Sequence, residues 1–402
     1  MRKLWSILVL LIVFTAGAQA QILENSFHLN AAADTLTNPA FQHGERAFEV
    51  SLGLGLDVGL NSWNPALILR YGSKDLDEKD KDVIIQATND ELLRLRVEGQ
   101  PYLGVKYNQF GLRVAGKAMA NGQLPTDVLR LALKGNELNK EYLLEDVNGE
   151  AAGYIEAAAL FAMPINELFE LYDFPEIVVG ISPKYLHGLA FGRFTGEASL
   201  ETQLADGAAK VVGTGEGKYA YSRTGAGFAL DFGVSAQISE ELRVDASVLN
   251  LGSMTWRNVQ EGAASGEVDV RISDIENAKF DYAVEDLKPG PDITWKVPRT
   301  YRIGGAYKAT SQLTVLADFS FSQSEAVGLT SRHAVGVEYR PWDFMPIQAG
   351  LIKHSKAPFR IDLGWGLEFA NFELGIGLNN VLGLVLPRSQ GMGLHLQTSV
   401  RF

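Results

Sequence analysis

The sequence predicts an all-β protein, a transmembrane antiparallel β-barrel placed in the outer membrane of a Gram-negative bacterium. Three observations predict it: an N-terminal secretion signal, long segments of alternating apolar and polar residues, and a final strand that ends in an aromatic residue. After the signal, no stretch is apolar over the about 20 residues that a spanning helix needs, so strands would have to cross the bilayer. We expect 14 strands within residues 46–402, with 12 or 16 as alternatives, because single-chain bacterial barrels have even numbers.

Residues 1–20 have the features of a cleaved signal peptide. A basic pair at positions 2–3 precedes the apolar run 4–14 and the small-x-small pattern at 18–20. The chain contains no cysteine, so we expect no lipid anchor on cysteine, no disulfide and no thiolate metal site. The formal net charge of -12 argues against a nucleic-acid partner, which would require a basic face.

The strand pattern is clearest at residues 48–60, where every second residue is apolar and the residues between are small or polar. A soluble sandwich also alternates, but its strands usually span about five or six residues. The last segment ends at Phe402, and such an aromatic end resembles the signal that the barrel assembly machinery reads. The expected partners are therefore this machinery and outer-membrane lipid. The same alternation recurs at 228–238, 313–321, 359–369, 372–379 and 392–402.

Other segments depart from the wall pattern. Residues 21–45 alternate poorly and are interpreted as a periplasmic or lumenal, plug-like segment. Helical insertions are expected near 73–96 and 124–136, the second with Thr126 as its cap and Gly135 as its stop. Acidic residues at 75–82 suggest a calcium loop, but the turn glycine and closing glutamate are missing, and a solvated helix start is favoured.

Further along the chain, residues 63–71 are a short strand candidate. The range 262–298 is expected to form a long extracellular loop, because it mixes short polar strands with prolines and a glycine. Aromatic residues near strand ends are expected in the interfacial girdles of the barrel. The residues assigned to the girdles are Trp63, Trp256, Trp342 and Tyr339.

The sequence gives no support for catalysis, a metal site or a cofactor. The six histidines do not cluster and show no zinc-binding spacing. The candidates for ligand contact are therefore the polar side chains on the inner faces of the strands. These could pair with one another and close a narrow lumen, or line a wet path in a wide one. They are Arg302, Glu338, Arg340, Arg360, Asp362, Glu368, Glu373, His395 and Arg401.

Four short segments resemble an uncharacterised outer-membrane barrel family of Bacteroidota, which is similar to the long-chain fatty-acid transporters of the FadL type. They are Asn38-Pro39-Ala40, 124–136 (LPTDVLRLALKGN), 180–188 (GISPKYLHG) and 248–256 (VLNLGSMTW). The resemblance implies that an N-terminal plug containing Asn38, Pro39 and Ala40 fills the barrel and that a hydrophobic ligand passes through it. The ligand-contact residues of that class have no counterparts here, and the helical insertions depart from its pattern.

Together these observations predict a channel or transporter for a small, hydrophobic ligand rather than an enzyme. The alternative is a non-transporting surface barrel that acts as a scaffold or binding module through its extracellular loops at 205–216 and 262–298.

Overall fold

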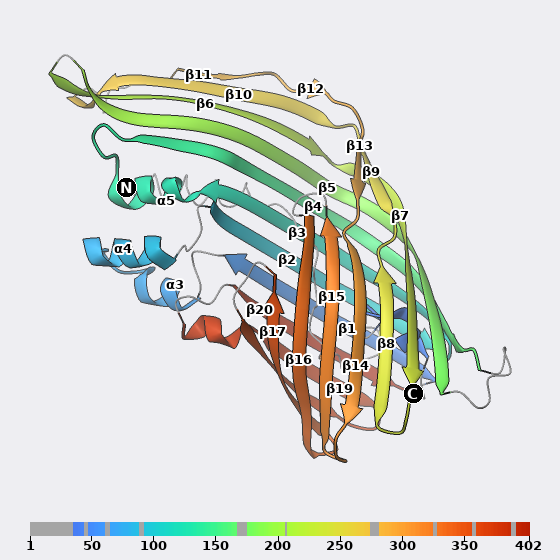
Figure 1. Ribbon diagram of the computed structural model, residues 1–402. Helices are drawn as coiled ribbons and strands as arrows, with labels where there is room; N and C mark the ends of the chain where they lie inside the picture. Colours follow the sequence, from blue (N-terminus) through green and yellow to red (C-terminus); the bar gives the residue numbers. More distant parts are fainter. Residues whose placement is uncertain are drawn as a thin grey trace.

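The computed structural model describes residues 35–43, 47–60, 65–87, 92–166, 175–205, 207–273, 281–324, 328–355, 359–386 and 391–402. Within these ranges the chain forms one closed antiparallel barrel with a tall extension on one side (Figure 1). The predicted signal peptide lies outside the described residues.

The wall has 14 strands, as predicted, when segments that continue one another are counted together. Closure is direct: β1 pairs with the last strand, β20, from Glu49 opposite Arg401 to Val58 opposite Met392. The first five are β1 (Phe48–Leu60), β2 (Leu92–Tyr107), β3 (Phe110–Pro125), β4 (Glu141–Pro164) and β5 (Glu176–Ala205). Each of the next three wall strands consists of several segments. The sixth joins β6 (Ala208–Ser222) to β7 (Thr224–Gln237), and the seventh joins β8 (Leu242–Leu249), β9 (Ser253–Arg257) and β10 (Gln260–Arg271). The eighth joins β11 (Asp281–Val284), β12 (Lys288–Pro289), β13 (Ile293–Lys296) and β14 (Arg299–Lys308). The last six are β15 (Leu313–Ser324), β16 (Gly328–Trp342), β17 (Met345–His354), β18 (Arg360–Glu368), β19 (Phe372–Asn379) and β20 (Met392–Arg401).

The two faces of the wall separate as the alternation predicts. On β1, Leu52 and Leu54 are 55% and 42% exposed, whereas Glu49 and Ser51 on the inner face are 0% and 2% exposed. Exposed aliphatic side chains recur on the outside of the other strands, and leaving so much apolar area in water costs about 25 cal/mol per Å². No helix in the described part of the chain is long and apolar enough to cross a membrane.

The two ends of the barrel differ. At the turn end, where the chain terminates, most connections are short, such as 108–109, 343–344 and 369–371. A ring of exposed aromatic side chains surrounds this end, as expected of an interfacial girdle. Of the residues assigned to the girdles, Trp342 and Tyr339 belong to this ring. The assignment of Trp256 was wrong, because its side chain is 0% exposed and points into the barrel. Trp63 lies outside the described residues. The ring consists of Tyr107, Phe110, Tyr307, Tyr339, Trp342, Phe344, Phe369, Phe372 and Phe402.

At the opposite end, the loop end, three helices pack together: α3 (Pro65–Tyr71), α4 (Glu78–Ala87) and α5 (Thr126–Lys134). Their shared core contains Leu67, Ile84 and Leu129. The strand expected at 63–71 is instead the helix α3, because its apolar residues pack at helical spacing against α4 and α5. Gly135 ends α5 with a φ of 77° as expected, but the cap position falls at Pro125 rather than at Thr126.

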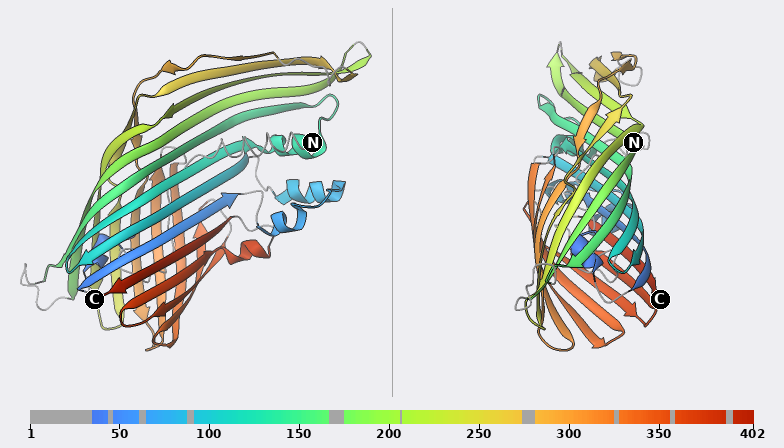
Figure 2. Two further views of the ribbon diagram at one scale, coloured as in Figure 1. Left: turned by 180° about the vertical axis from the view of Figure 1, so that it is seen from behind. Right: turned by 90° about the vertical axis from the view of Figure 1, so that its right-hand side faces the viewer.

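The loop end also carries a sheet that extends beyond the rest of the wall (Figure 2). We call it the distal sheet: residues 141–153 of β4, 191–205 of β5, β6, β10 and β11. Most of the predicted long loop at 262–298 is thus strand, since β10 to β13 pair within this sheet and the adjoining wall. The loop assignment was wrong because these strands consist mostly of polar and small residues and lack the long apolar alternation of membrane strands.

Candidate functional site in the barrel lumen

Residues 35–43, the described part of the predicted N-terminal segment, dock inside the barrel. Residues 39–42 form the 3-10 helix η1 (Pro39–Gln42), which contacts β4, β5 and β7. Asn38 caps this helix by accepting a hydrogen bond from the Ala40 N–H at 2.9 Å. Its side-chain amide donates to the carbonyl oxygens of Val234 and Ala246, at 3.0 and 3.2 Å. Asn38 therefore organises η1 and attaches it to the wall at once.

Two wall glycines make room for this segment. A Cβ atom on Gly180 would overlap the backbone of Pro39 and Ala40, and one on Gly233 would overlap the Asn38 side chain. Only glycine lets the two backbones approach so closely. The docked position of η1 is thus encoded in the wall as well as in the N-terminal segment.

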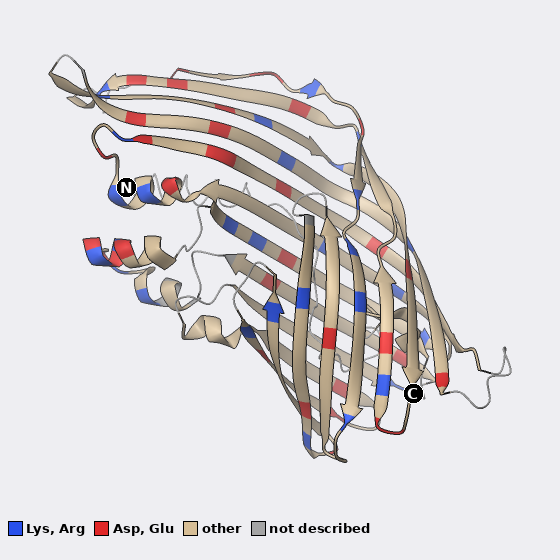
Figure 3. Ribbon diagram, in the orientation of Figure 1, with Lys and Arg blue, Asp and Glu red and all other residues tan. Residues whose placement is uncertain are grey.

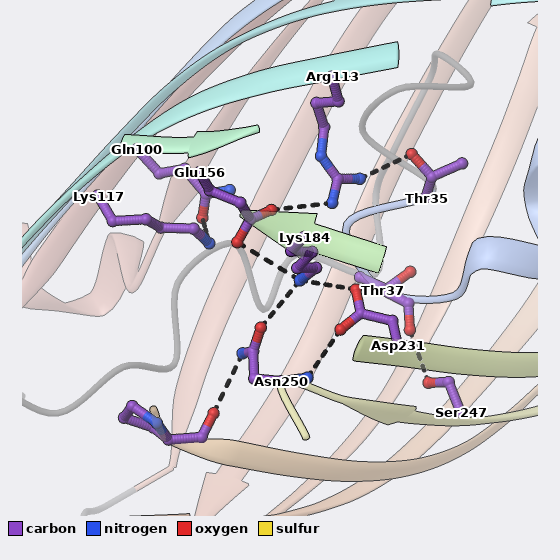
Figure 4. Close-up of polar contacts among 11 residues, drawn as sticks. Thr35, Thr37, Gln100, Arg113, Lys117, Glu156, Lys184, Asp231, Ser247 and Asn250 are labelled. Carbon is purple, nitrogen blue, oxygen red and sulfur yellow. Dashed lines mark hydrogen bonds and ion pairs between the residues drawn. The ribbon is translucent and has the colours of Figure 1, made fainter. Parts of the chain in front are cut away.

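A network of buried charges lies beside η1 (Figure 4). Glu156 accepts a hydrogen bond from Arg113 at 3.1 Å and forms an ion pair with Lys184 at 3.4 Å. Lys184 also pairs with Asp231 at 2.6 Å. All four side chains are at most 5% exposed, so each charge depends on its partners for compensation.

Further hydrogen bonds join this network to the N-terminal segment and to the neighbouring strands. Arg113 donates to the Thr35 hydroxyl at 2.9 Å, and the Ser247 hydroxyl donates to the Thr37 carbonyl at 2.6 Å. Asn250 accepts from Lys184 at 2.8 Å, and its backbone N–H donates to Asp231 at 2.7 Å. The N-terminal segment is therefore bonded to both β3 and β8 across the lumen.

An apolar cluster follows the charged network in the direction of the loop end. Tyr154, two residues from Glu156 on the same face of β4, contacts Trp295 edge to face, with ring centroids 5.9 Å apart. Trp256 stacks on Phe191 at 5.3 Å. Trp295 also donates a hydrogen bond to Glu150 at 3.1 Å. The lumen thus contains a polar layer beside η1 and an aromatic layer between that polar layer and the loop end.

The charged residues predicted to face the lumen lie on the opposite side of the barrel, on β14 to β20. There they pair with one another or with acids of the same face. Arg340 binds Glu368 through two hydrogen bonds of 2.8 and 2.9 Å and Glu338 through one of 2.6 Å. Arg360 pairs with Asp362 at 3.2 Å, and Arg401 pairs with Glu373.

The remaining two predicted residues also have acidic partners. Arg302 forms an ion pair with Asp318, which in turn binds Arg332. His395 lies 3.2 Å from Asp57 and 2.7 Å from the Asn379 side chain. These pairs form a belt on β1, β14 to β16 and β18 to β20, and the belt shares no residue with the network beside η1.

The sequence reasoning missed the network of Arg113, Glu156, Lys184 and Asp231. The sequence pattern could have revealed it, because each of these charged residues stands alone among apolar or small residues. Each also occupies a position of the alternation that faces the inside of the barrel. Three of the four segments that carried the family resemblance meet here: they supply Asn38, Lys184 and Asn250.

Hydrocarbon transporters and channels are among the solved structures that resemble the chain. A mutant of the monoaromatic hydrocarbon channel TodX, lacking S2 and S3, matches with a TM-score of 0.51 and 10% identity, covering 97% of this chain and 98% of that one. The Pseudomonas putida toluene transporter TodX gives 0.49 and 9% identity, covering 96% and 95%. A Pseudomonas aeruginosa FadL homologue gives 0.47 and 11%, covering 96% and 98%. The match to the TodX mutant shows the fold alone, a closed antiparallel barrel of 14 strands, as predicted.

The sequence itself matches a family of unknown function, DUF5723, over residues 39–374, and the chain belongs to that family. No curated protein matches the sequence. The barrel fold supports the predicted outer-membrane location, whereas an origin in Bacteroidota stays a prediction.

Proposed function

We propose that this protein is an outer-membrane channel for a small hydrophobic ligand, with residues 35–43 acting as a plug in its lumen. One observation carries the proposal: η1 docks inside a closed barrel, where Gly180 and Gly233 leave room for it, beside a buried network of charges. Short turns are typical of the periplasmic end of such barrels and longer connections of the extracellular end. The plug then lies at the periplasmic end.

The layering of the lumen supports a hydrophobic ligand. Coming from the loop end, a ligand meets the aromatic layer of Tyr154, Phe191, Trp256 and Trp295 before the charged layer. These four side chains are at most 3% exposed and pack together, so their apolar area would contact a hydrocarbon only if the cluster opened. A ligand that continued toward the periplasm would require η1 to move, because η1 contacts β4, β5 and β7. The fold shared with a monoaromatic hydrocarbon channel is consistent with this class of ligand.

The test uses a Gram-negative host that lacks its own hydrocarbon channels. Uptake of radiolabelled toluene and of a long-chain fatty acid is measured with and without expression of the protein. We expect expression to increase uptake of at least one probe. The proposal is wrong if a barrel shown to be folded in the outer membrane, by heat-modifiable migration on a gel, leaves the uptake of both unchanged.

A matched pair of variants then examines the plug. Gly180→Ala places a methyl group against the backbone of η1, whereas Gly192→Ala, in the same strand, meets nothing within 4 Å. We expect Gly180→Ala to displace η1 and produce ion conductance in planar bilayers, and Gly192→Ala to conduct no more than the wild type. Equal conductance of the two variants would contradict the proposal that residues 35–43 act as a plug.

The distal sheet favours a second candidate function, a surface barrel that binds a partner. The segments 205–216 and 262–298 were predicted to be partner-binding loops, and the first of them, together with residues 262–271 and 281–284 of the second, contributes to that sheet. The two functions are compatible, because the distal sheet and the lumenal network share no residue.

A further inference from the structure

The inner face of the distal sheet is hollowed. A cavity of about 750 Å³ opens there, lined by residues of β4, β5, β6, β10 and β11. Five carboxylates contribute to its lining and no lysine or arginine does. The acidic bands along these strands are visible in Figure 3. The five acids are Glu145, Glu197, Glu216, Glu267 and Asp281.

The acids are arranged against the usual rule for cross-strand pairs. Glu197 lies directly opposite Glu216, and Glu267 lies directly opposite Asp281. Like charges at directly opposite positions destabilise a sheet. None of these four side chains forms an ion pair with a described residue, although two lysines, Lys210 and Lys218, belong to the same strand face. Lys210 is engaged by Asp269 at 2.6 Å.

The hollow ends at a free strand edge. Among the described strands, β11 pairs with β10 alone, and its four residues are exposed. The Glu285 N–H donates to the Ala263 carbonyl. Hydrogen-bonded pairs alternate along an antiparallel ladder, so the backbone groups of Tyr282 and Val284 point away from β10. Such an edge is a template for another strand.

Side chains on the two faces of this edge differ in chemistry. Asp281 points to the acidic hollow, whereas Tyr282 and Val284 on the other face are 78% and 60% exposed. A strand added to β11 would place every second side chain beside the acids and the others beside Tyr282 and Val284.

We propose that the distal sheet binds an extended polypeptide segment in which basic and apolar residues alternate, by strand addition to β11. The lysines or arginines of that segment neutralise the opposed carboxylates. The relief of this repulsion drives binding. The segment belongs to a partner protein rather than to a second copy of this chain, because the edge sequence 281–286 (DYAVED) is itself acidic. The proposal does not depend on transport through the lumen.

The test measures fluorescence anisotropy of a labelled peptide, KTKVKTKVK, with the purified full-length protein in detergent. We expect the quadruple variant Glu197→Gln, Glu216→Gln, Glu267→Gln, Asp281→Asn to bind at least about tenfold more weakly, since several exposed ion pairs are lost together. The matched control removes four exposed acids elsewhere, with Asp75→Asn, Glu78→Gln, Glu240→Gln and Asp343→Asn. It carries the same net charge and should bind like the wild type.

Two further arms separate strand addition from simple attraction of charge. The peptide KKKKKTVTV has the same composition in block order. Tyr282→Pro removes a backbone donor at the free edge, where proline is tolerated. We expect both changes to weaken binding by about fivefold or more, as hydrogen bonds and register are lost.

The outcomes are distinct. Equal binding by the quadruple variant and its control overturns the acidic site. Strand addition is overturned if the quadruple variant binds the peptide more weakly while the block-order peptide and Tyr282→Pro leave the affinity unchanged. The site would then attract any polycation. Heat-modifiable migration of each variant on a gel shows that its barrel is folded. Failure of peptide binding leaves the uptake results untouched, and the reverse also holds.

Discussion

The lumenal network and the distal sheet share the long strands β4 and β5, but acidic residues have cationic partners in the first and face one another in the second. In the lumen, Lys184 lies between Glu156 and Asp231, and all three are buried. On the distal sheet, Glu197 and Glu216 face each other without a cation between them.

The difference follows from solvent. A buried charge without a partner costs several kcal/mol, so the lumen permits acids only where cations compensate them. On an exposed sheet, water and salt screen the repulsion, and a weakly unfavourable arrangement can persist. The paired charges of the lumen are thus required by burial, whereas nothing in the packing requires the opposed acids of the distal sheet.

The sharpest test of this contrast removes one lysine from each region. Lys184→Met leaves Glu156 and Asp231 buried without their shared cation and should lower the free energy of unfolding by about 3–5 kcal/mol. Lys218→Met, at an exposed position of the distal sheet, should change it by less than about 0.5 kcal/mol. Urea unfolding followed by heat-modifiability provides the measurement, and comparable losses in the two variants would contradict the contrast.

A smaller effect is expected where the lumen binds the plug. Asn38→Ala removes the hydrogen bonds to the carbonyls of Val234 and Ala246 and should weaken docking of η1 by about 1–3 kcal/mol. The check is the rate of proteolytic cleavage within residues 35–43, which should rise. Asn148→Ala, which loses one hydrogen bond at an exposed site, serves as the control and should leave that rate unchanged.

On the distal sheet, removing a charge is expected to raise the free energy of unfolding rather than lower it. Glu216→Gln removes one charge of an opposed pair and should stabilise the sheet by about 0.2–1 kcal/mol. Slower proteolysis of β6 at low ionic strength would show this, and the difference from the wild type should shrink in high salt. Destabilisation by Glu216→Gln at low salt would mean that the carboxylates do not repel one another in the folded state.

The smallest effect concerns the helices at the loop end. The hydrogen bond from Lys74 holds the pKa of Asp80 below its usual value. Because the folded pKa is depressed, the contribution of Asp80 is complete above the unfolded value near 3.8 and is lost as the pH falls below it. Protease susceptibility of α4 should therefore be constant from about pH 7 to 5 and rise below about pH 4, and Asp80→Asn should abolish this rise.

The sequence was sufficient to predict the barrel, its 14 strands and the inner and outer faces of β1, because membrane strands alternate over their whole length. Trp256 was misplaced because its parity becomes ambiguous where Asn250 interrupts the strand with a φ of 61°. The strands at 262–298 were missed since their residues are mostly polar or small, so no strong apolar alternation marks them. Which inner-face charges meet across the lumen depends on strand register and closure, and these are tertiary properties.

The continuity of the strands has a mechanical consequence. Apart from Arg223, β6 runs without interruption into β7, and β5 is one strand of 30 residues from the barrel to the tip of the distal sheet. A pull on the tip acts along the strand axes, where many ladder hydrogen bonds resist it together. The same strand contains Lys184, so a load applied at the tip of the distal sheet would be transmitted along β5 to the buried network.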